Sequence, residues 1–122
     1  MFPCELDSDS WRINDYPMSE PHRIRPLFEG PPATPGTERF DVLFERHGVV
    51  IERITSSGSQ PPQTFCQSQD EWILLLRGHA EMRIDGELIT LHEGESLRLF
   101  ANTPHEVITT SEQALWLAVH VL

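Results

Sequence analysis

The sequence predicts an all-β fold, a small barrel or sandwich of short strands that follows an extended arm. Turn signals recur about every 8–12 residues from residue 49 onward, a spacing typical of antiparallel sheets. No window of this region shows sustained helical periodicity. The segment 80–84 alternates apolar and polar residues, which places Ala80, Met82 and Ile84 on one inner face.

Residues 1–36 are predicted to form the extended arm, and residues 37–122 the β-barrel domain. Seven of the ten prolines lie before Gly36. Such a density of proline is incompatible with a long helix or a central strand. Apolar side chains in the arm favour docking against the barrel or a partner, the alternative being a tail without a role. These side chains are Trp11, Ile13, Tyr16, Leu27 and Phe28.

The barrel domain divides into short strand candidates separated by turns. Residues 40–46 are compatible with either strand or helix, whereas 49–55 are rich in β-branched residues. Residues 56–62 contain Ser, Gly and Pro and are predicted to be a loop. Further strands are expected at 64–67, 71–76, 80–84, 88–91, 96–100, 106–110 and 114–121.

Two of the expected strands are apolar on both faces. In segments 72–76 and 114–119 the apolar residues do not alternate with polar ones. One face can line the barrel interior, and the other must be covered by a second sheet, the arm or a partner subunit. This pattern predicts a homodimer.

Charge and composition exclude several classes of function. Nineteen acidic residues stand against nine basic ones, all of them Arg, and the net charge is −10. The absence of Lys excludes Schiff-base and phosphate-loop lysine chemistry. The acidic balance argues against nucleic acid and anionic membranes as partners. The longest apolar runs, 72–76 and 114–119, are far too short to span a membrane.

The location expected from the sequence is the cytoplasm. The N-terminus lacks the basic start and apolar stretch of a secretory signal. Cys4 and Cys66 have no CxxC spacing, and reduced thiols are the simpler interpretation, although a disulfide remains an alternative.

Two spaced motifs resemble those of the cupin family of small β-barrels. Gly58 is followed after five residues by Thr64-Phe65-Cys66, then after four by Glu71 and after six by Gly78. These spacings match the first cupin motif, whose two histidines are replaced here by Thr64 and Cys66. In the second motif Gly94 and His105 match, while Phe100, Asn102 and Thr109 replace Pro, Gly and Asn. The likeness covers about residues 38–122, and segments 70–78 and 116–120 resemble one group of single-domain bacterial cupins.

The resemblance implies a jelly-roll barrel of two antiparallel sheets with a site inside it. It also implies that the motif residues hold a divalent metal such as Zn, Fe, Mn or Ni. Carried over by position, the ligand places fall on Thr64, Cys66, Glu71 and His105. Thr64 is a poor ligand, whereas a Cys66 thiolate, Glu71 and His105 form a three-ligand set with open positions.

Other interpretations of the same residues remain open. Cys66 can be a small buried apolar residue, and Glu71 and His105 can hydrogen-bond each other. His120 becomes a further metal candidate if it faces inward from the last strand. Because a buried carboxylate beside an imidazole has a perturbed pKa, Glu71 and His105 are the candidate acid–base pair. An arginine clamp for a carboxylate ligand would require Arg53, Arg77 or Arg98 to point inward, whereas the surface is the more common place for arginine.

Three hypotheses for the function follow. The first is a binding module with a degenerate metal site, which holds a small molecule in a lumen lined by Phe65, Ile73, Leu75, Met82, Leu97 and Leu99. The second is a metal-dependent enzyme, an isomerase or oxygenase, that uses Cys66, Glu71 and His105. The third is a structural or interaction module whose barrel is filled by its own side chains.

Overall fold

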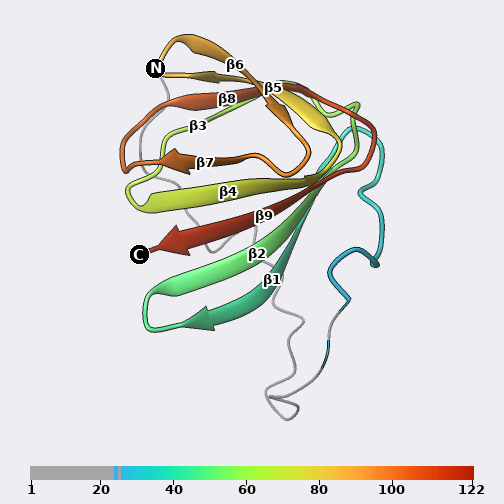
Figure 1. Cartoon of the computed structure of the whole chain (residues 1–122), viewed down its shortest axis with the longest axis horizontal. Coiled ribbons are helices and arrows are strands. Elements are labelled where there is room, and N and C mark those ends of the chain that lie inside the picture. Colours follow the sequence, from blue (N-terminus) through green and yellow to red (C-terminus); the bar gives the residue numbers. More distant parts are fainter. Residues whose placement is uncertain (1–23, 25) are drawn as a thin grey trace.

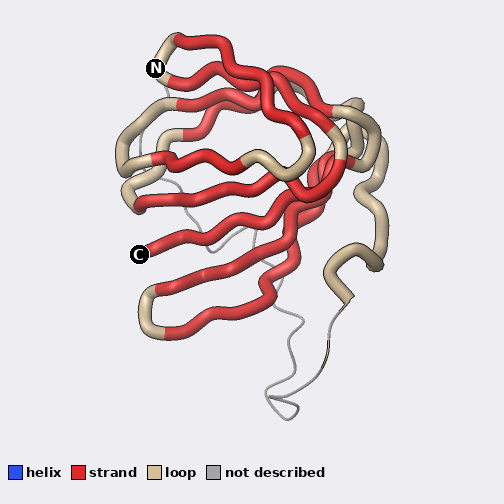
Figure 2. The backbone as a smooth tube through the Cα atoms, viewed as in Figure 1, coloured by secondary structure: helices blue, strands red, loops and turns tan. Residues whose placement is uncertain are grey.

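The computed structural model describes residue 24 and residues 26–122, which form nine β-strands. The described residues contain no helix of the length and apolarity needed to cross a membrane. The strands are β1 (Glu38–Arg46), β2 (Val49–Ser56), β3 (Gln63–Phe65), β4 (Asp70–Arg77), β5 (His79–Ile84), β6 (Glu87–His92), β7 (Ser96–Leu99), β8 (His105–Thr110) and β9 (Ala114–Val121). They form a five-stranded sheet in the order β1-β2-β9-β4-β7 and a four-stranded sheet in the order β3-β8-β5-β6 (Figures 1 and 2). The predicted all-β class with two antiparallel sheets is confirmed.

Residues 40–46, for which the sequence allowed either strand or helix, belong to strand β1. It pairs with β2 from Glu38 opposite Ser56 to Arg46 opposite Val49. A register shift lies between Val42 and Phe44, and such a bulge interrupts the alternation of side chains. This interruption explains why the segment shows no clean period in the sequence.

The two sheets share an interior that is apolar along most of its length. Ala80 and Met82 are buried and Ile84 is partly buried, as their alternation in the sequence predicts. Trp116 packs in this core, and its indole N–H donates a hydrogen bond to the buried Ser56 hydroxyl. The buried core comprises Ile73, Leu75, Ala80, Met82, Leu91, Leu99, Ala114, Trp116 and Ala118.

The outer face of the five-stranded sheet is covered by the polypeptide only in part. Residues 27–32 lie over Thr55, Arg77 and Leu115 and enclose a cavity of about 130 Å³ with them. In another row of the same face, Phe44 is 48% exposed and Trp72 is 37% exposed. The homodimer predicted from this apolar face stays a prediction.

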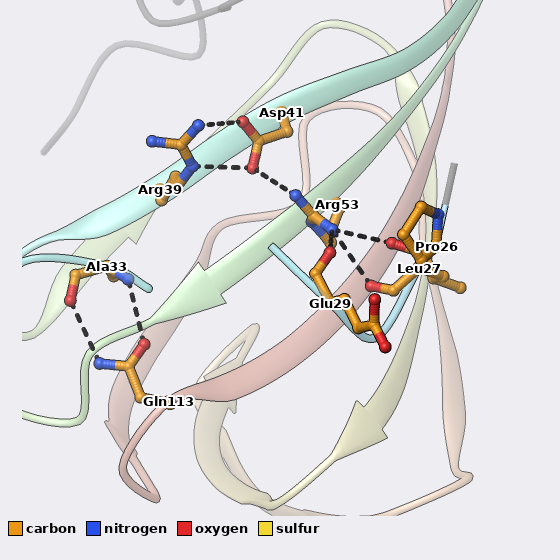
Figure 3. A network of polar contacts seen from close by, with 8 residues as sticks. All are labelled: Pro26, Leu27, Glu29, Ala33, Arg39, Asp41, Arg53 and Gln113. Carbon is orange, nitrogen blue, oxygen red and sulfur yellow. Dashed lines mark hydrogen bonds and ion pairs between the residues drawn. The ribbon is translucent and has the colours of Figure 1, made fainter. Parts of the chain in front are cut away.

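Residues 26–33, called the docked arm below, are held by side chains of the sheet (Figure 3). Arg53 donates from Nη1 to the carbonyl oxygens of Leu27 and Glu29 at 3.2 and 2.7 Å. Its Nη2 donates to the buried carboxylate of Asp41 at 3.2 Å. Gln113 forms two hydrogen bonds with the backbone of Ala33. Docking of the expected arm is therefore observed for this part, while Trp11, Ile13 and Tyr16 lie outside the described residues.

We expect Arg53→Lys to loosen the docked arm although it preserves the positive charge. A lysine ammonium cannot reproduce the planar fork that reaches Asp41 and the arm carbonyls together. The free energy of unfolding should fall by about 2 kcal/mol, and protease cleavage within the arm should accelerate. The matched control is Arg98→Lys, because Arg98 contacts only the exposed ring of Phe100 among the described interactions. Equal cleavage rates in both variants would contradict this role of Arg53.

The motif glycines differ in what surrounds them, so their substitutions should differ in cost. Gly58 has φ +99°, and an added Cβ would lie 2.7 Å from the Glu112 Cα. Gly94 has φ +85° with open space around it. We expect Gly58→Ala to cost about 3 kcal/mol of stability and Gly94→Ala about 1 kcal/mol, as measured by urea denaturation. Equal costs would mean that the contact with Glu112 does not matter.

Candidate functional site

Four titratable side chains from four strands meet at one end of the barrel interior, the end at which β9 terminates (left in Figure 1). Glu71 of β4 stands directly opposite His120 of β9 in the ladder. Glu52 of β2 lies two positions from the partner of His120, so the two side chains meet diagonally. His105 of β8 reaches the group from the other sheet.

Glu52 and His120 form the buried back of this cluster. His120 Nε2 lies 2.7 Å from Glu52 Oε1, and the side chains are 2% and 1% exposed. A hydrogen bond of this length between a buried imidazole and carboxylate requires both groups to be held in register by their strands. Glu52 and His120 therefore hold each other in place, and they form the part of the site that the five-stranded sheet contributes behind Glu71.

Glu71 faces both imidazoles. Its Oε2 lies 3.6 Å from His120 Nε2, and its Oε1 lies 3.8 Å from His105 Nε2. Burial raises the pKa of Glu71 to about 7, with a further increase from the charge of Glu52 and an opposing effect from His120. Glu71 thus exchanges its proton near neutral pH, as a general acid or base does.

His105 is oriented by two contacts. Its Nδ1 donates to the carbonyl oxygen of Thr103 at 3.0 Å, and its ring stacks on Phe65 with centroids 5.6 Å apart. A carbonyl only accepts, so the proton of the neutral imidazole lies on Nδ1 and the lone pair on Nε2 faces Glu71. Burial lowers the pKa of His105, outweighing the hydrogen bond to Thr103. His105 is therefore a proton acceptor at neutral pH.

The structure brings together the acid–base pair expected from the motifs and adds a residue that sequence reasoning missed. Glu71 and His105 face each other, and His120 points inward as its parity allowed. Glu52 was not among the predicted site residues. The sequence does contain an indication of its position. Glu52 lies two residues after Val50 in a β-rich run, so both side chains point to the same inner face of the sheet. The catalytic role of Glu71 and His105 stays a prediction.

The metal set expected from the resemblance does not fit this geometry. Among the described residues, no group of three or more His, Cys, Asp or Glu side chains is arranged to hold a metal ion. Cys66 is in a disulfide, so the expectation of a reduced thiol is wrong for this structure. A disulfide sulfur is not a thiolate ligand. A metal role for Cys66 stays a prediction that applies only to the reduced chain.

Most residues predicted to line a lumen take part in core packing. Ile73, Leu75, Met82 and Leu99 belong to the buried cluster, and Leu97 packs against it. Phe65 instead stacks on His105 at the polar end. The contact of each predicted lining residue with a ligand stays a prediction.

The arginines considered for a carboxylate clamp do not reach the cluster. Arg53 is held by Asp41 and the docked arm, and Arg77 lies over the ring of Phe28. Arg98 lies over the ring of Phe100. These contacts lie outside the barrel interior, so the surface alternative holds for all three.

Comparison with known proteins identifies the family. The model of the cupin domain matches residues 51–120. A crystal structure of a candidate mannose-6-phosphate isomerase from Ralstonia eutropha is 31% identical, covers 81% of this chain and 97% of its own, and has a TM-score of 0.72. No curated protein matches the chain.

More distant solved structures share the fold alone. An RmlC-like cupin from Shewanella frigidimarina is 13% identical with a TM-score of 0.63, and the match covers 73% of this chain and 79% of that one. A transcriptional regulator of the HTH_3 family from Vibrio cholerae is 23% identical with a TM-score of 0.61, covering 70% and 51%. Taken with the two sheets and the motif spacings, the family match establishes that this chain belongs to the cupin family.

Proposed function

We propose that this cupin binds a small molecule at the cluster end of its barrel, through Glu71 and His105. The observation that carries the proposal is a gradient of exposure within the cluster. The side chains of Glu71 and His105 are 8% and 7% exposed, whereas those of Glu52 and His120 are 1% and 2% exposed. A ligand that enters the interior would therefore meet Glu71 and His105, with the other pair behind them.

The geometry of Glu71 and His105 suits a hydroxyl group. Their facing atoms are 3.8 Å apart, which is too long for a direct hydrogen bond. An oxygen placed about 2.8 Å from both atoms would see them at about 85°, an angle that a hydroxyl can accept. Protonated Glu71 would donate to this oxygen, and the lone pair of His105 would accept its proton.

Binding can be tested with a small-molecule library read by thermal shift. The wild-type protein, Glu71→Gln and His105→Gln are compared with the matched surface controls Glu81→Gln and His79→Gln, whose side chains are exposed. We expect compounds that raise the Tm of the wild type and the controls but not of the two site variants. If no compound depends on Glu71 or His105, the barrel is a filled structural module and the proposal is wrong.

A second candidate function is acid–base isomerisation. It is favoured by the 31% identity to the candidate mannose-6-phosphate isomerase, of which the match covers 97%. Isomerisation of this kind needs one group that removes a proton and one that returns it, and Glu71 and His105 offer both. Among the described residues no group is arranged to hold a metal ion, so no step of this scheme is assigned to one. Turnover of aldoses or ketoses that Glu71→Gln abolishes would establish it.

The partner and location expected from the sequence remain proposals. We propose a homodimer through the row that contains Phe44 and Trp72, and light scattering of the full chain tests it. A monomer at all concentrations would contradict the dimer. The cytoplasmic location also stays a proposal; it requires the disulfide of Cys66 to be reduced in the cell, because such bonds rarely persist in a reducing cytosol.

A further inference from the structure

The charges that face the candidate site are acidic or neutral. Glu52 and Glu71 contribute two carboxylates, and His105 has a pKa that burial lowers, so it is neutral near pH 7. His120 is the remaining imidazole, and it lies between the two carboxylates at 2.7 and 3.6 Å. Any positive charge on His120 is therefore already directed at Glu52 and Glu71 rather than at an incoming ligand.

The cationic side chains of the described residues are engaged elsewhere. The chain has no Lys, so arginine is the only strong cation available. Arg39 and Arg53 bind Asp41 on the outer face of the sheet, and Arg83 lies 3.8 Å from Glu106. The remaining described arginines contact His47, Phe28 and Phe100. None of these contacts lies in the cluster.

The other common means of binding phosphate is the N-terminus of a helix, where backbone N–H groups converge. The described residues form strands, turns and loops but no helix. A phosphate or carboxylate placed beside Glu71 would thus meet like charge without a compensating cation or dipole from the described part of the chain. Burying an anion in that setting is unfavourable.

From these observations we infer that the site takes an uncharged hydroxyl-bearing compound and discriminates against its phosphate ester. The inference rests on the proposed function and names its ligand class. When Glu71 is protonated, Glu71 and His105 supply one donor and one acceptor for a hydroxyl. When Glu71 is ionised, Glu52 and Glu71 both repel an anion, and in neither state does a cation of the described residues face the site. The phosphorylated compound in the name of the Ralstonia eutropha relative is therefore not the class that this site selects.

The test uses matched pairs that differ only by a phosphate. The neutral members are mannose, glucose, fructose and glycerol, and the partners are mannose 6-phosphate, glucose 6-phosphate, fructose 6-phosphate and glycerol 3-phosphate. Binding to the full chain is measured by ligand-observed NMR at constant pH and ionic strength. We expect at least one neutral member to bind with an affinity about tenfold or more above that of its ester. Glu71→Gln should abolish binding of the neutral member, as the proposed function requires, whereas the exposed-site variant Glu81→Gln should preserve both this binding and the ratio.

Two outcomes would overturn the inference. One is an ester that binds as tightly as its neutral partner, or more tightly, in a way that His105→Gln abolishes. In that case the site binds small molecules as proposed, and only the ligand class is wrong. The other is that no member of any pair binds. If library compounds that depend on Glu71 and His105 nevertheless exist, the proposed function stands without this ligand class, and if none exists both fail.

Discussion

Replacement of His120 by leucine should lower the free energy of unfolding by about 3–5 kcal/mol, the usual cost of removing one partner from a buried ion pair. Glu52 is 1% exposed and lies 2.7 Å from His120, and Glu71 lies 3.6 Å from the same nitrogen. The variant would leave two carboxylates close together without the imidazole between them. Urea denaturation at neutral pH measures the loss.

A double-mutant cycle supplies the control for this prediction. Apolar replacement of both members of a buried ion pair is often close to neutral, because desolvation of the charges is then no longer required. Glu52→Leu combined with His120→Leu should therefore recover much of the stability lost in His120→Leu alone. A double variant no more stable than His120→Leu would show that the loss comes from altered packing and not from the broken pair.

Replacement of Glu71 by glutamine should stabilise the protein near pH 8 by about 3 kcal/mol and have little effect near pH 4. Burial raises the pKa of Glu71 from its ordinary 4.5 to about 7, so the folded state binds this proton more tightly than the unfolded state does. The contribution of Glu71 to stability is therefore fully present below pH 4.5 and is lost as the pH rises to about 7. Glutamine removes that loss.

The measurement is urea denaturation of wild type and Glu71→Gln across this pH range. His105 acts in the opposite direction, because its lowered pKa makes stability fall as the pH drops through the ordinary value of 6.5. This effect of His105 is common to both proteins, so the difference between their free energies of unfolding reports on Glu71. The exposed Glu81→Gln should follow the wild type at every pH. A Glu71→Gln variant that is less stable than wild type near pH 8 would mean that the Glu71 carboxylate is not strained by burial.

The resemblance of the two motifs to those of cupins was sufficient to predict the barrel, and their glycines and glycine substitutes mark its turns. Asn102, in the place of a motif glycine, has φ 62°, a conformation that asparagine tolerates better than most residues. Motif spacing also placed Glu71 and His105 on strands that face each other, and their facing atoms are 3.8 Å apart.

Other features could not be predicted from short stretches of the sequence. Residues of β1 gave no clear period because a bulge interrupts the pairing between Val42 and Phe44. The expectation of a reduced Cys66 was wrong, since spacing along the chain says little about which cysteines approach in space. The outward position of Arg53 was one of two alternatives that the sequence left open, and its contacts with the arm carbonyls could not be predicted from it.

By itself the sequence determined where strands and turns lie, that Glu71 and His105 occupy one barrel interior, and that no lysine is available for chemistry. The strands, turns and lysine count follow from local period, turn residues and composition, whereas the shared interior of Glu71 and His105 is implied by the resemblance to the cupin motifs. The tertiary structure alone decided that Glu52 joins His120 behind Glu71 and that Arg53 holds the docked arm. The first contact depends on which strands pair and in which register, and a charged residue within an apolar run does not reveal its partner until that register is set. The second depends on where the docked arm crosses the sheet, which no local pattern determines.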